Sequence, residues 1–327
     1  MSAPIIIIGT GLAGYQLARE FRRADPTTAL LIITADAGKF YSKPQLSTAL
    51  TSGKTSDSLV TASAEAMIEQ LNANIRTNTT VTRIDPDTKT IWIGNEAVSY
   101  AKVVLACGAD VIKAPLEGSG VPDVLSINHL YHYAMFQELI KDKKKITILG
   151  AGLIGCEFAN DLSNAGYQVD VIAPAKAPLD FLIPESVGKL LQQALSTHGV
   201  KWHLQKVANK IDKTPEGYRV YLSDGSQLET DFVLSAIGLI PHIALAQTAK
   251  IKTERGVVVN RFLETSVPDI YALGDCAEVE GHVLPFITPL LNCSRALAKT
   301  LAGTRTAVDY PAMPVHRYQE RLFQESD

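Results

Sequence analysis

A buried strand, a glycine-rich turn and an amphipathic helix follow one another at the start of the chain. The β-branched run Ile5–Ile8 has the length and composition of a strand covered on both faces. A turn with three glycines spans residues 9–14, and residues 17–21 carry an apolar stripe at helical spacing. Asp25 and the proline after it are typical of a helix end, and residues 29–34 predict a second strand.

The same pattern recurs later in the chain. Residues 146–149 predict a strand, residues 150–155 repeat the glycine-rich turn, and residues 158–162 carry the buried face of a helix. Gly166 stands where a glycine after a helix end is expected. The chain therefore contains two copies of one strand–turn–helix–strand unit.

Short alternating strands and a closing apolar strand that ends in glycine follow each copy. We expect a doubly repeated α/β fold, in which two Rossmann-like dinucleotide-binding domains each carry a small antiparallel β-meander. The predicted meander strands are residues 81–84 and 90–93 in the first copy and 210–212 and 218–222 in the second, and the closing strands are residues 103–108 and 232–238.

Composition narrows the class of protein. A chain of 327 residues with 46% apolar content is long enough for about two domains of roughly 150 residues. The net charge of −3 gives no overall attraction to nucleic acid or to an anionic membrane. No apolar run approaches the roughly 20 residues of a bilayer-spanning helix, and no secretory leader is visible, so we expect a cytoplasmic protein.

The four cysteines show no spacing that indicates a metal site or a redox dithiol. Cys107, Cys156, Cys276 and Cys293 are scattered, and no C-x-x-C pair occurs among them. We expect structural thiols and no bound metal.

The first glycine turn has the features of a diphosphate cradle. Gly9 permits a tight turn, Gly11 lets the backbone approach a pyrophosphate, and Gly14 lets the helix pack closely on the strand. Thr10, Leu12 and Ala13 complete the turn, and its amide groups face the phosphates at the helix N-terminus. Asp36 ends the second strand, where a carboxylate accepts hydrogen bonds from a ribose. The alternative is a purely structural glycine turn.

The second turn has the same context, with Gly150, Gly152, Leu153, Ile154 and Gly155 as its candidate cofactor-binding residues. The strand after it ends at Ala173 with no acid for a free ribose hydroxyl and no arginine for a 2′-phosphate, and Lys176 is the nearest charge. NADH and NADPH both remain open. Two dinucleotide sites in one chain favour a protein that brings FAD and NAD(P)H together.

Four stretches resemble the two-dinucleotide flavoprotein reductases, and more closely the rubredoxin reductases. The resemblance extends over residues 4–315, and its motifs are residues 41–47, 150–161, 265–275 and 287–301. It implies an FAD-binding domain made of residues 1–112 and 241–315, with an NAD(P)H-binding domain of residues 113–240 between its two parts.

The resemblance also assigns roles to single residues. Asp275 bonds a ribityl hydroxyl of FAD, and Lys43 is the cation beside the flavin, although many relatives have a second lysine where this chain has Thr48. Glu157 reaches toward the flavin and the nicotinamide; its alternative interpretation is a solvated helical glutamate. Lys43 and Glu157 are thus the catalytic candidates. Backbone contacts to FAD are implied at Val81, Ala106 and Ile287.

The implied reaction needs no acid–base residue. A hydride passes from NADH to FAD, and the electrons leave singly to a rubredoxin, which serves alkane hydroxylation. A monomer or a homodimer is equally compatible with the sequence. The alternatives are a ferredoxin-type or flavorubredoxin reductase, a slow NADH-sensing flavoprotein of the apoptosis-inducing type, and an inactive fragment.

Residues 316–327 depart from the family. Relatives continue beyond the position of Val315 into a C-terminal interface domain, whereas residues 316–327 form a highly charged tail that does not match it. Since that domain covers part of the flavin in the family, we expect weaker retention of FAD.

Overall fold

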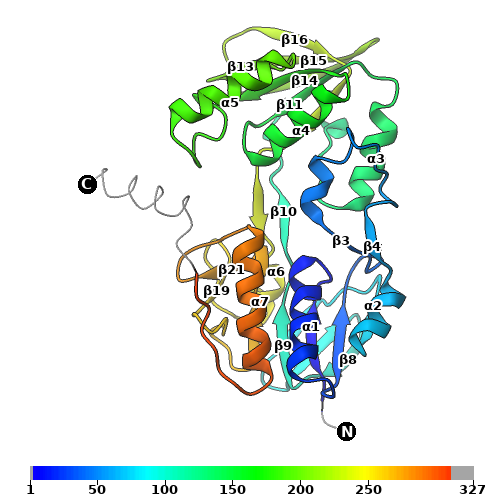
Figure 1. Ribbon diagram of the computed structural model, residues 1–327, viewed down its shortest axis with the longest axis vertical. Helices are drawn as coiled ribbons and strands as arrows, with labels where there is room; N and C mark the ends of the chain where they lie inside the picture. Colours follow the sequence, from blue (N-terminus) through cyan, green and yellow to red (C-terminus); the bar gives the residue numbers. More distant parts are fainter. Residues whose placement is uncertain (1–2, 311–327) are drawn as a thin grey trace, which may run out of the picture. The chain divides into compact units, whose positions relative to one another are not determined.

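The computed structural model describes residues 3–310 and divides the chain into two compact units. Unit 1 contains residues 3–42, 60–110 and 240–310 of the described chain, and unit 2 contains residues 43–59 and 111–239. Each unit has its own sheet and helices (Figure 1). The predicted tail, residues 316–327, lies outside the described residues.

Unit 1 is built on a parallel sheet of five strands in the order β20-β9-β1-β2-β5. The apolar run at the start of the chain is its central strand, and all four of its side chains are buried because helices and the meander cover the two faces. The strands are β1 (Ile5–Ile8), β2 (Leu30–Ile33), β5 (Asn74–Arg76), β9 (Lys102–Leu105) and β20 (Ile270–Ala272).

Helices α1 (Leu12–Ala24) and α7 (Ile287–Leu301) pack side by side in unit 1 (Figure 1). The predicted stripe on α1 is fully buried at Leu17, Ala18 and Phe21, and α1 ends at Asp25 as expected. Unit 1 also contains α2 (Ala64–Leu71), α6 (Ala244–Thr248), the short 3₁₀ turn η3 (Gly274–Cys276), the paired strands β3 (Phe40–Tyr41) and β4 (Val60–Ala62), the paired strands β19 (Val257–Val259) and β21 (Ala277–Val279), and the meander β6 (Arg83–Asp85), β7 (Thr90–Ile93) and β8 (Glu96–Ser99).

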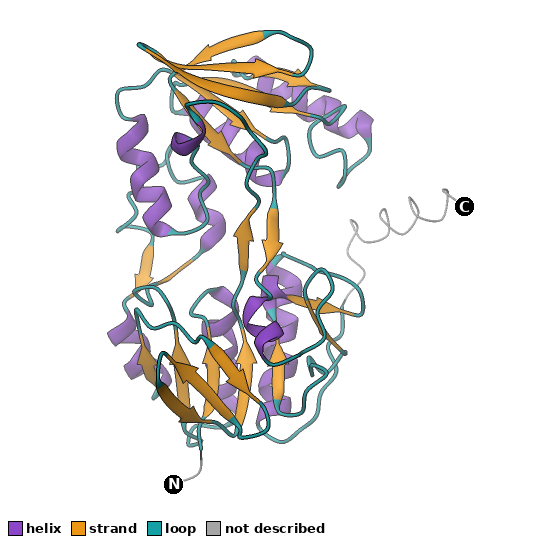
Figure 2. Cartoon of the chain, turned by 180° about the vertical axis from the view of Figure 1, so that it is seen from behind, coloured by secondary structure: helices purple, strands orange, loops and turns teal. Residues whose placement is uncertain are grey.

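Unit 2 has a four-stranded parallel sheet in the order β13-β12-β11-β17, with an antiparallel meander of its own. The sheet consists of β11 (Lys145–Leu149), β12 (Gln168–Ala173), β13 (Lys201–Leu204) and β17 (Phe232–Ser235), and the meander of β14 (Ala208–Thr214), β15 (Gly217–Leu222) and β16 (Gln227–Thr230). The helices are α3 (Leu130–Ile140), α4 (Leu153–Asn164) and α5 (Glu185–Thr197), with short 3₁₀ turns η1 (Lys43–Ser47) and η2 (Val121–Asp123). Figure 2 shows the strands and helices of both units from behind.

The predicted fold class is confirmed: each unit combines a parallel α/β sheet with a three-stranded antiparallel meander. The strand predicted at residues 81–84 begins later, at Arg83, because Val81 lies outside the ladder between β6 and β7. Two strands, β10 (Ala109–Val111) and β18 (Leu239–Pro241), pair where the chain passes between the units. In the described part of the chain, no helix has the length and apolarity needed to cross a bilayer.

Candidate functional site

The first glycine turn joins β1 to α1 and has the geometry of a cradle. A Cβ atom on Gly9 would lie 2.2 Å from the carbonyl oxygen of Ala106, and one on Gly14 would lie 1.9 Å from the carbonyl oxygen of Gly9. Neither position tolerates a side chain without a backbone shift, whereas a Cβ on Gly11 would meet no heavy atom within 4 Å. The middle glycine therefore faces open space at the N-terminus of α1, where an anion is favoured.

Asp36 lies just after β2, beside this turn. Its Oδ1 accepts hydrogen bonds from the hydroxyl of Thr34 (2.8 Å), the hydroxyl of Thr10 (3.3 Å) and the amide of Gly38 (2.8 Å). The carboxylate is thus fixed while the residue stays exposed. A fixed carboxylate with its second oxygen available can accept the hydroxyl of a ribose. Thr34, which the sequence analysis did not identify, is needed for this arrangement.

The remaining predicted FAD-binding residues of unit 1 come from several elements. Gly274 turns sharply after β20 with φ +75°, and its α-carbon lies so close to α1 that a Cβ would be 2.7 Å from the Cβ of Ala13. Asp275 follows directly. Ile287 begins α7 with an exposed side chain, while Val81 is buried. Carboxyl ends of parallel strands form the binding edge of such sheets, so Asp275, which follows β20, lies where a nucleotide site is expected.

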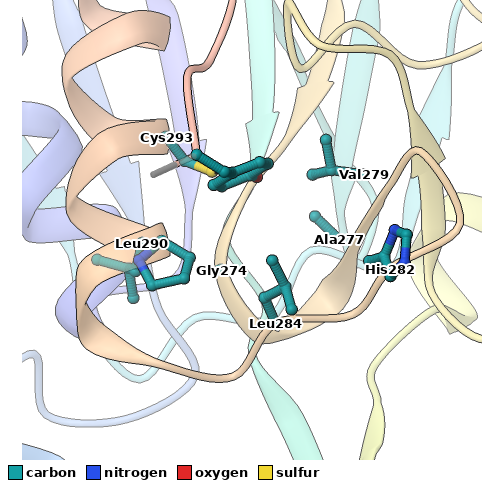
Figure 3. A pocket seen from close by; sticks show the side chains of 9 residues that line it. Gly274, Ala277, Val279, His282, Leu284, Leu290 and Cys293 are labelled. Atoms are coloured by element: carbon teal, nitrogen blue, oxygen red, sulfur yellow. The ribbon is translucent and has the colours of Figure 1, made fainter. Parts of the chain in front are cut away.

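A small cavity lies beside Gly274, between α7 and β21 (Figure 3). Its volume is about 10 Å³, which is enough for a single water molecule. Leu290, Cys293, Ala277 and Val279 point into it, so its lining is mostly apolar (Figure 3). A cavity of this size holds no organic substrate.

The second turn, between β11 and α4, repeats the steric pattern of the first. A Cβ on Gly150 would lie 2.5 Å from the carbonyl oxygen of Ala236, and one on Gly155 would lie 2.2 Å from the carbonyl oxygen of Gly150. A Cβ on Gly152 would meet only the ring of Phe181, at 3.6 Å, which is an ordinary contact. The middle glycine again has room for a Cβ atom, but in the second cradle the ring of Phe181 lies beside it.

The surroundings of the second cradle are apolar. Leu153 and Ile154, in the first turn of α4, expose 41% and 40% of their surface although they are aliphatic. The amide of Leu179 donates to the carbonyl oxygen of Ala151 (3.0 Å), which ties the loop after β12 to the turn. Such an apolar rim suits the flat rings of a nucleotide.

The two catalytic candidates both belong to unit 2. Lys43 begins η1, and Glu157 lies on α4 one turn after the glycine cradle. The hydroxyl of Ser47, at the end of η1, donates to a carboxylate oxygen of Glu157. Glu157 is therefore hydrogen-bonded and half-buried.

All four cysteines are unpaired thiols. Burial raises the pKa of Cys156 to about 12 and the pKa values of Cys276 and Cys293 to about 11 each, and it raises the pKa of Cys107 well above its usual range. Thiols with such pKa values are poor nucleophiles at neutral pH. These pKa values therefore give no support to dithiol chemistry.

The chain belongs to the pyridine nucleotide-disulphide oxidoreductase family, whose sequence profile matches residues 3–300. Among its relatives is the rubredoxin-NAD(+) reductase of Alcanivorax borkumensis, which is 49% identical over 313 residues, covering 95% of this chain and 82% of that protein. The rubredoxin-NAD(+) reductase of Acinetobacter baylyi is 45% identical over 95% of this chain and 81% of its own length.

Solved structures agree with this assignment. A ferredoxin reductase from Rhodopseudomonas palustris superposes with a TM-score of 0.89 at 27% identity, covering 95% of this chain and 79% of that one. The NADH:rubredoxin oxidoreductase from Clostridium acetobutylicum superposes with a TM-score of 0.79 at 21% identity over 96% of this chain and 78% of that one, which shows a shared fold.

Proteins of this family are oxidoreductases that use FAD and NAD(H). The residues of this chain fit both groups, because each of its two turns has glycine wherever a Cβ would collide with backbone and leaves the middle glycine accessible to a diphosphate.

Proposed function

We propose that the chain is an FAD-dependent reductase that passes electrons from NADH to a rubredoxin. The partner class, a small iron–sulfur electron carrier, is supported by the names of the relatives and by a superposition on the putidaredoxin reductase–putidaredoxin complex with a TM-score of 0.87 at 25% identity, covering 95% of this chain and 78% of that one. The observation that carries the proposal is the pair of accessible glycine cradles in one chain. A dehydrogenase with one nucleotide substrate needs only one.

Within this proposal, unit 1 binds FAD. The N-terminus of α1 and the accessible face of Gly11 take the diphosphate, Asp36 accepts a ribose hydroxyl, and Asp275 bonds the ribityl chain. Backbone groups of Ala106, Val81 and Ile287 complete the site.

Unit 2 binds NADH at the cradle of Gly150, Gly152 and Gly155, with Leu153 and Ile154 as its apolar rim. Bound FAD and NADH supply the hydride and single-electron chemistry. The task of Lys43 is electrostatic, because its charge would stabilise the negative charge of a reduced flavin. Glu157 holds Ser47, which follows Lys43 on η1.

We further propose that electron delivery serves alkane hydroxylation and takes place in the cytoplasm. The four unpaired cysteines support a reducing compartment, since oxidising compartments favour disulfides.

Rapid anaerobic mixing tests the proposal. Purified protein loaded with FAD is mixed with NADH and then, in a second mix, with oxidised rubredoxin or with a plant-type ferredoxin, and flavin and iron absorbance are followed together. We expect NADH to bleach the flavin within one turnover and rubredoxin to reoxidise it faster than ferredoxin does. Equal rates with both carriers would contradict the rubredoxin proposal, and a flavin that NADH does not bleach would contradict the enzyme itself.

A further inference from the structure

Residues 43–59 leave the first unit of the chain and are held by helices of unit 2. The strongest attachment is the carboxylate of Asp161 on α4, which accepts the amide of Leu50 at 2.8 Å on one oxygen and the amide of Thr51 at 2.9 Å on the other. The hydroxyl of Thr51 also donates to the carbonyl oxygen of Asp161 (2.8 Å). Asp161 itself is buried, with 4% of its surface exposed.

A second attachment lies one turn earlier on the same helix. Ser47 binds Glu157, so residues 157 and 161 of α4, four positions apart, hold two successive points of the segment. The far end is held by α3, where the hydroxyl of Tyr133 and the amide nitrogen of Gln137 donate to the carbonyl oxygen of Lys54 (3.2 and 3.0 Å). The segment thus has a fixed register on unit 2.

Hydrogen bonds to both of its oxygens explain how the carboxylate of Asp161 can be buried. A buried carboxylate is costly unless each of its oxygens is hydrogen-bonded, and here both accept backbone amides. Leu50 and Thr51 belong to no helix or strand, so their backbone amides need an acceptor outside regular secondary structure. Removing one partner leaves the other unsatisfied, so the clamp holds only when the carboxylate is present.

We infer that Asp161 is a positioning residue, which fixes the Leu50–Thr51 turn and thereby keeps Lys43 and Ser47 in register with Glu157. This inference rests on the proposed function, because it is the reductase reaction that needs Lys43 and Glu157 in place. The same helix α4 begins at the nicotinamide cradle and holds the segment that carries the flavin-side cation. Asp161 is buried and acts through the segment, whose amides its carboxylate accepts.

The test uses Asp161→Asn with Asp231→Asn as a matched control. Asp231 also binds two successive amides with its carboxylate, those of Lys144 and Lys145 at 2.7 and 2.9 Å. It directly precedes β17 and holds the start of β11, at the opposite end of that strand from Gly150. Both substitutions remove a carboxylate charge, but asparagine keeps one acceptor oxygen. At Asp231 one oxygen accepts both amides and can keep them, whereas at Asp161 each oxygen accepts one amide and one bond is lost. Only the first loosens the segment of Lys43.

Two readouts distinguish positioning from general stability. In Asp161→Asn we expect hydrogen exchange at the amides of Leu50 and Thr51 to become about tenfold faster, with or without cofactor. With ferricyanide as acceptor, flavin reduction by NADH should become about tenfold slower while the KM for NADH stays within about twofold, because orientation and not binding is lost. Asp231→Asn should change neither quantity.

If Asp161→Asn does not fold, Thr51→Val replaces it. Thr51 is exposed, and the valine keeps its shape but loses the bond to the Asp161 carbonyl, so a smaller slowing of flavin reduction is expected. Flavin reduction at the wild-type rate in a folded Asp161→Asn or Thr51→Val protein would overturn the inference. Since ferricyanide needs no protein partner, failure with rubredoxin alone would affect only the proposed function.

Discussion

Replacing Gly11 by alanine should separate cofactor binding from folding. Gly11 has extended backbone angles, φ −60° and ψ −178°, that alanine adopts freely, and its new methyl group would meet no atom within 4 Å. The unfolded chain loses entropy with the substitution, so the cofactor-free protein should be as stable as wild type or more stable by about 0.5 kcal/mol. The methyl group instead occupies the space through which the diphosphate approaches.

The expected loss of FAD affinity follows from the hydrogen bonds at stake. Keeping one phosphate oxygen from a backbone amide removes a charge-assisted bond worth about 1.5–3 kcal/mol. At about 1.4 kcal/mol per tenfold, the Kd for FAD should rise roughly tenfold to a hundredfold. Flavin fluorescence titration of the cofactor-free protein measures this Kd, and denaturant unfolding measures the stability.

Gly14→Ala is the matched control. Its methyl group would lie 1.9 Å from the Gly9 carbonyl oxygen, so it should destabilise the cofactor-free protein by about 2–3 kcal/mol. If Gly11→Ala lowers the stability of the cofactor-free protein as much as Gly14→Ala does, or if it leaves the FAD affinity unchanged, the assignment of the first turn as a diphosphate cradle is refuted.

Three further outcomes are expected. Gly152→Ala should raise the KM for NADH about tenfold in steady-state assays with ferricyanide and leave FAD content unchanged; a loss of FAD would contradict the assignment of the second cradle. Hydrogen bonding to Arg305 lowers the pKa of Glu264 from 4.5 to about 2, so the ion pair stabilises the fold above about pH 4.5 and loses this effect as the pH falls through 2. Since Arg305 is 58% exposed, Glu264→Gln should cost only about 1 kcal/mol in denaturant unfolding at pH 7 and clearly less near pH 2, where about half of the Glu264 carboxyl groups are protonated; an equal cost at both pH values would exclude the ion pair as its source. With pKa values of about 11, Cys276 and Cys293 should react with Ellman's reagent far more slowly in the native protein than after unfolding, and equal rates would show that they are not buried.

The sequence predicted the two strand–turn–helix units because their signals are local. A β-branched run, glycines at fixed offsets and an apolar stripe on a helix each depend on neighbours within about a dozen residues. The buried face of α1 and the glycine after α4 were therefore placed correctly: Leu17, Ala18 and Phe21 are buried, and Gly166 adopts φ +92°. The clashes that a side chain would meet at Gly14 and Gly155 are local in the same way, whereas those at Gly9 and Gly150 involve the distant carbonyl oxygens of Ala106 and Ala236.

Long-range polar partners were not predictable in this way. Asp161 binds Leu50 and Thr51 across about 110 positions of sequence, and nothing in the polarity of residues 43–59 indicates an acceptor on α4. The family resemblance implies that Lys43 belongs to the FAD-binding domain, and the contacts of residues 43–59 group them with unit 2. Only tertiary hydrogen bonds decide where such an irregular segment attaches.

A binding experiment with NAD⁺, which cannot reduce the flavin, tests most directly whether one chain holds two separate dinucleotides. Protein saturated with FAD is titrated with NAD⁺ in a calorimeter, and the amount of FAD that remains bound per chain is measured after gel filtration. Two independent cradles require that NAD⁺ binds at one equivalent per chain while the FAD stays in place, and that Gly152→Ala weakens this step alone. If NAD⁺ instead displaces FAD, the two nucleotides share a site and the account is wrong.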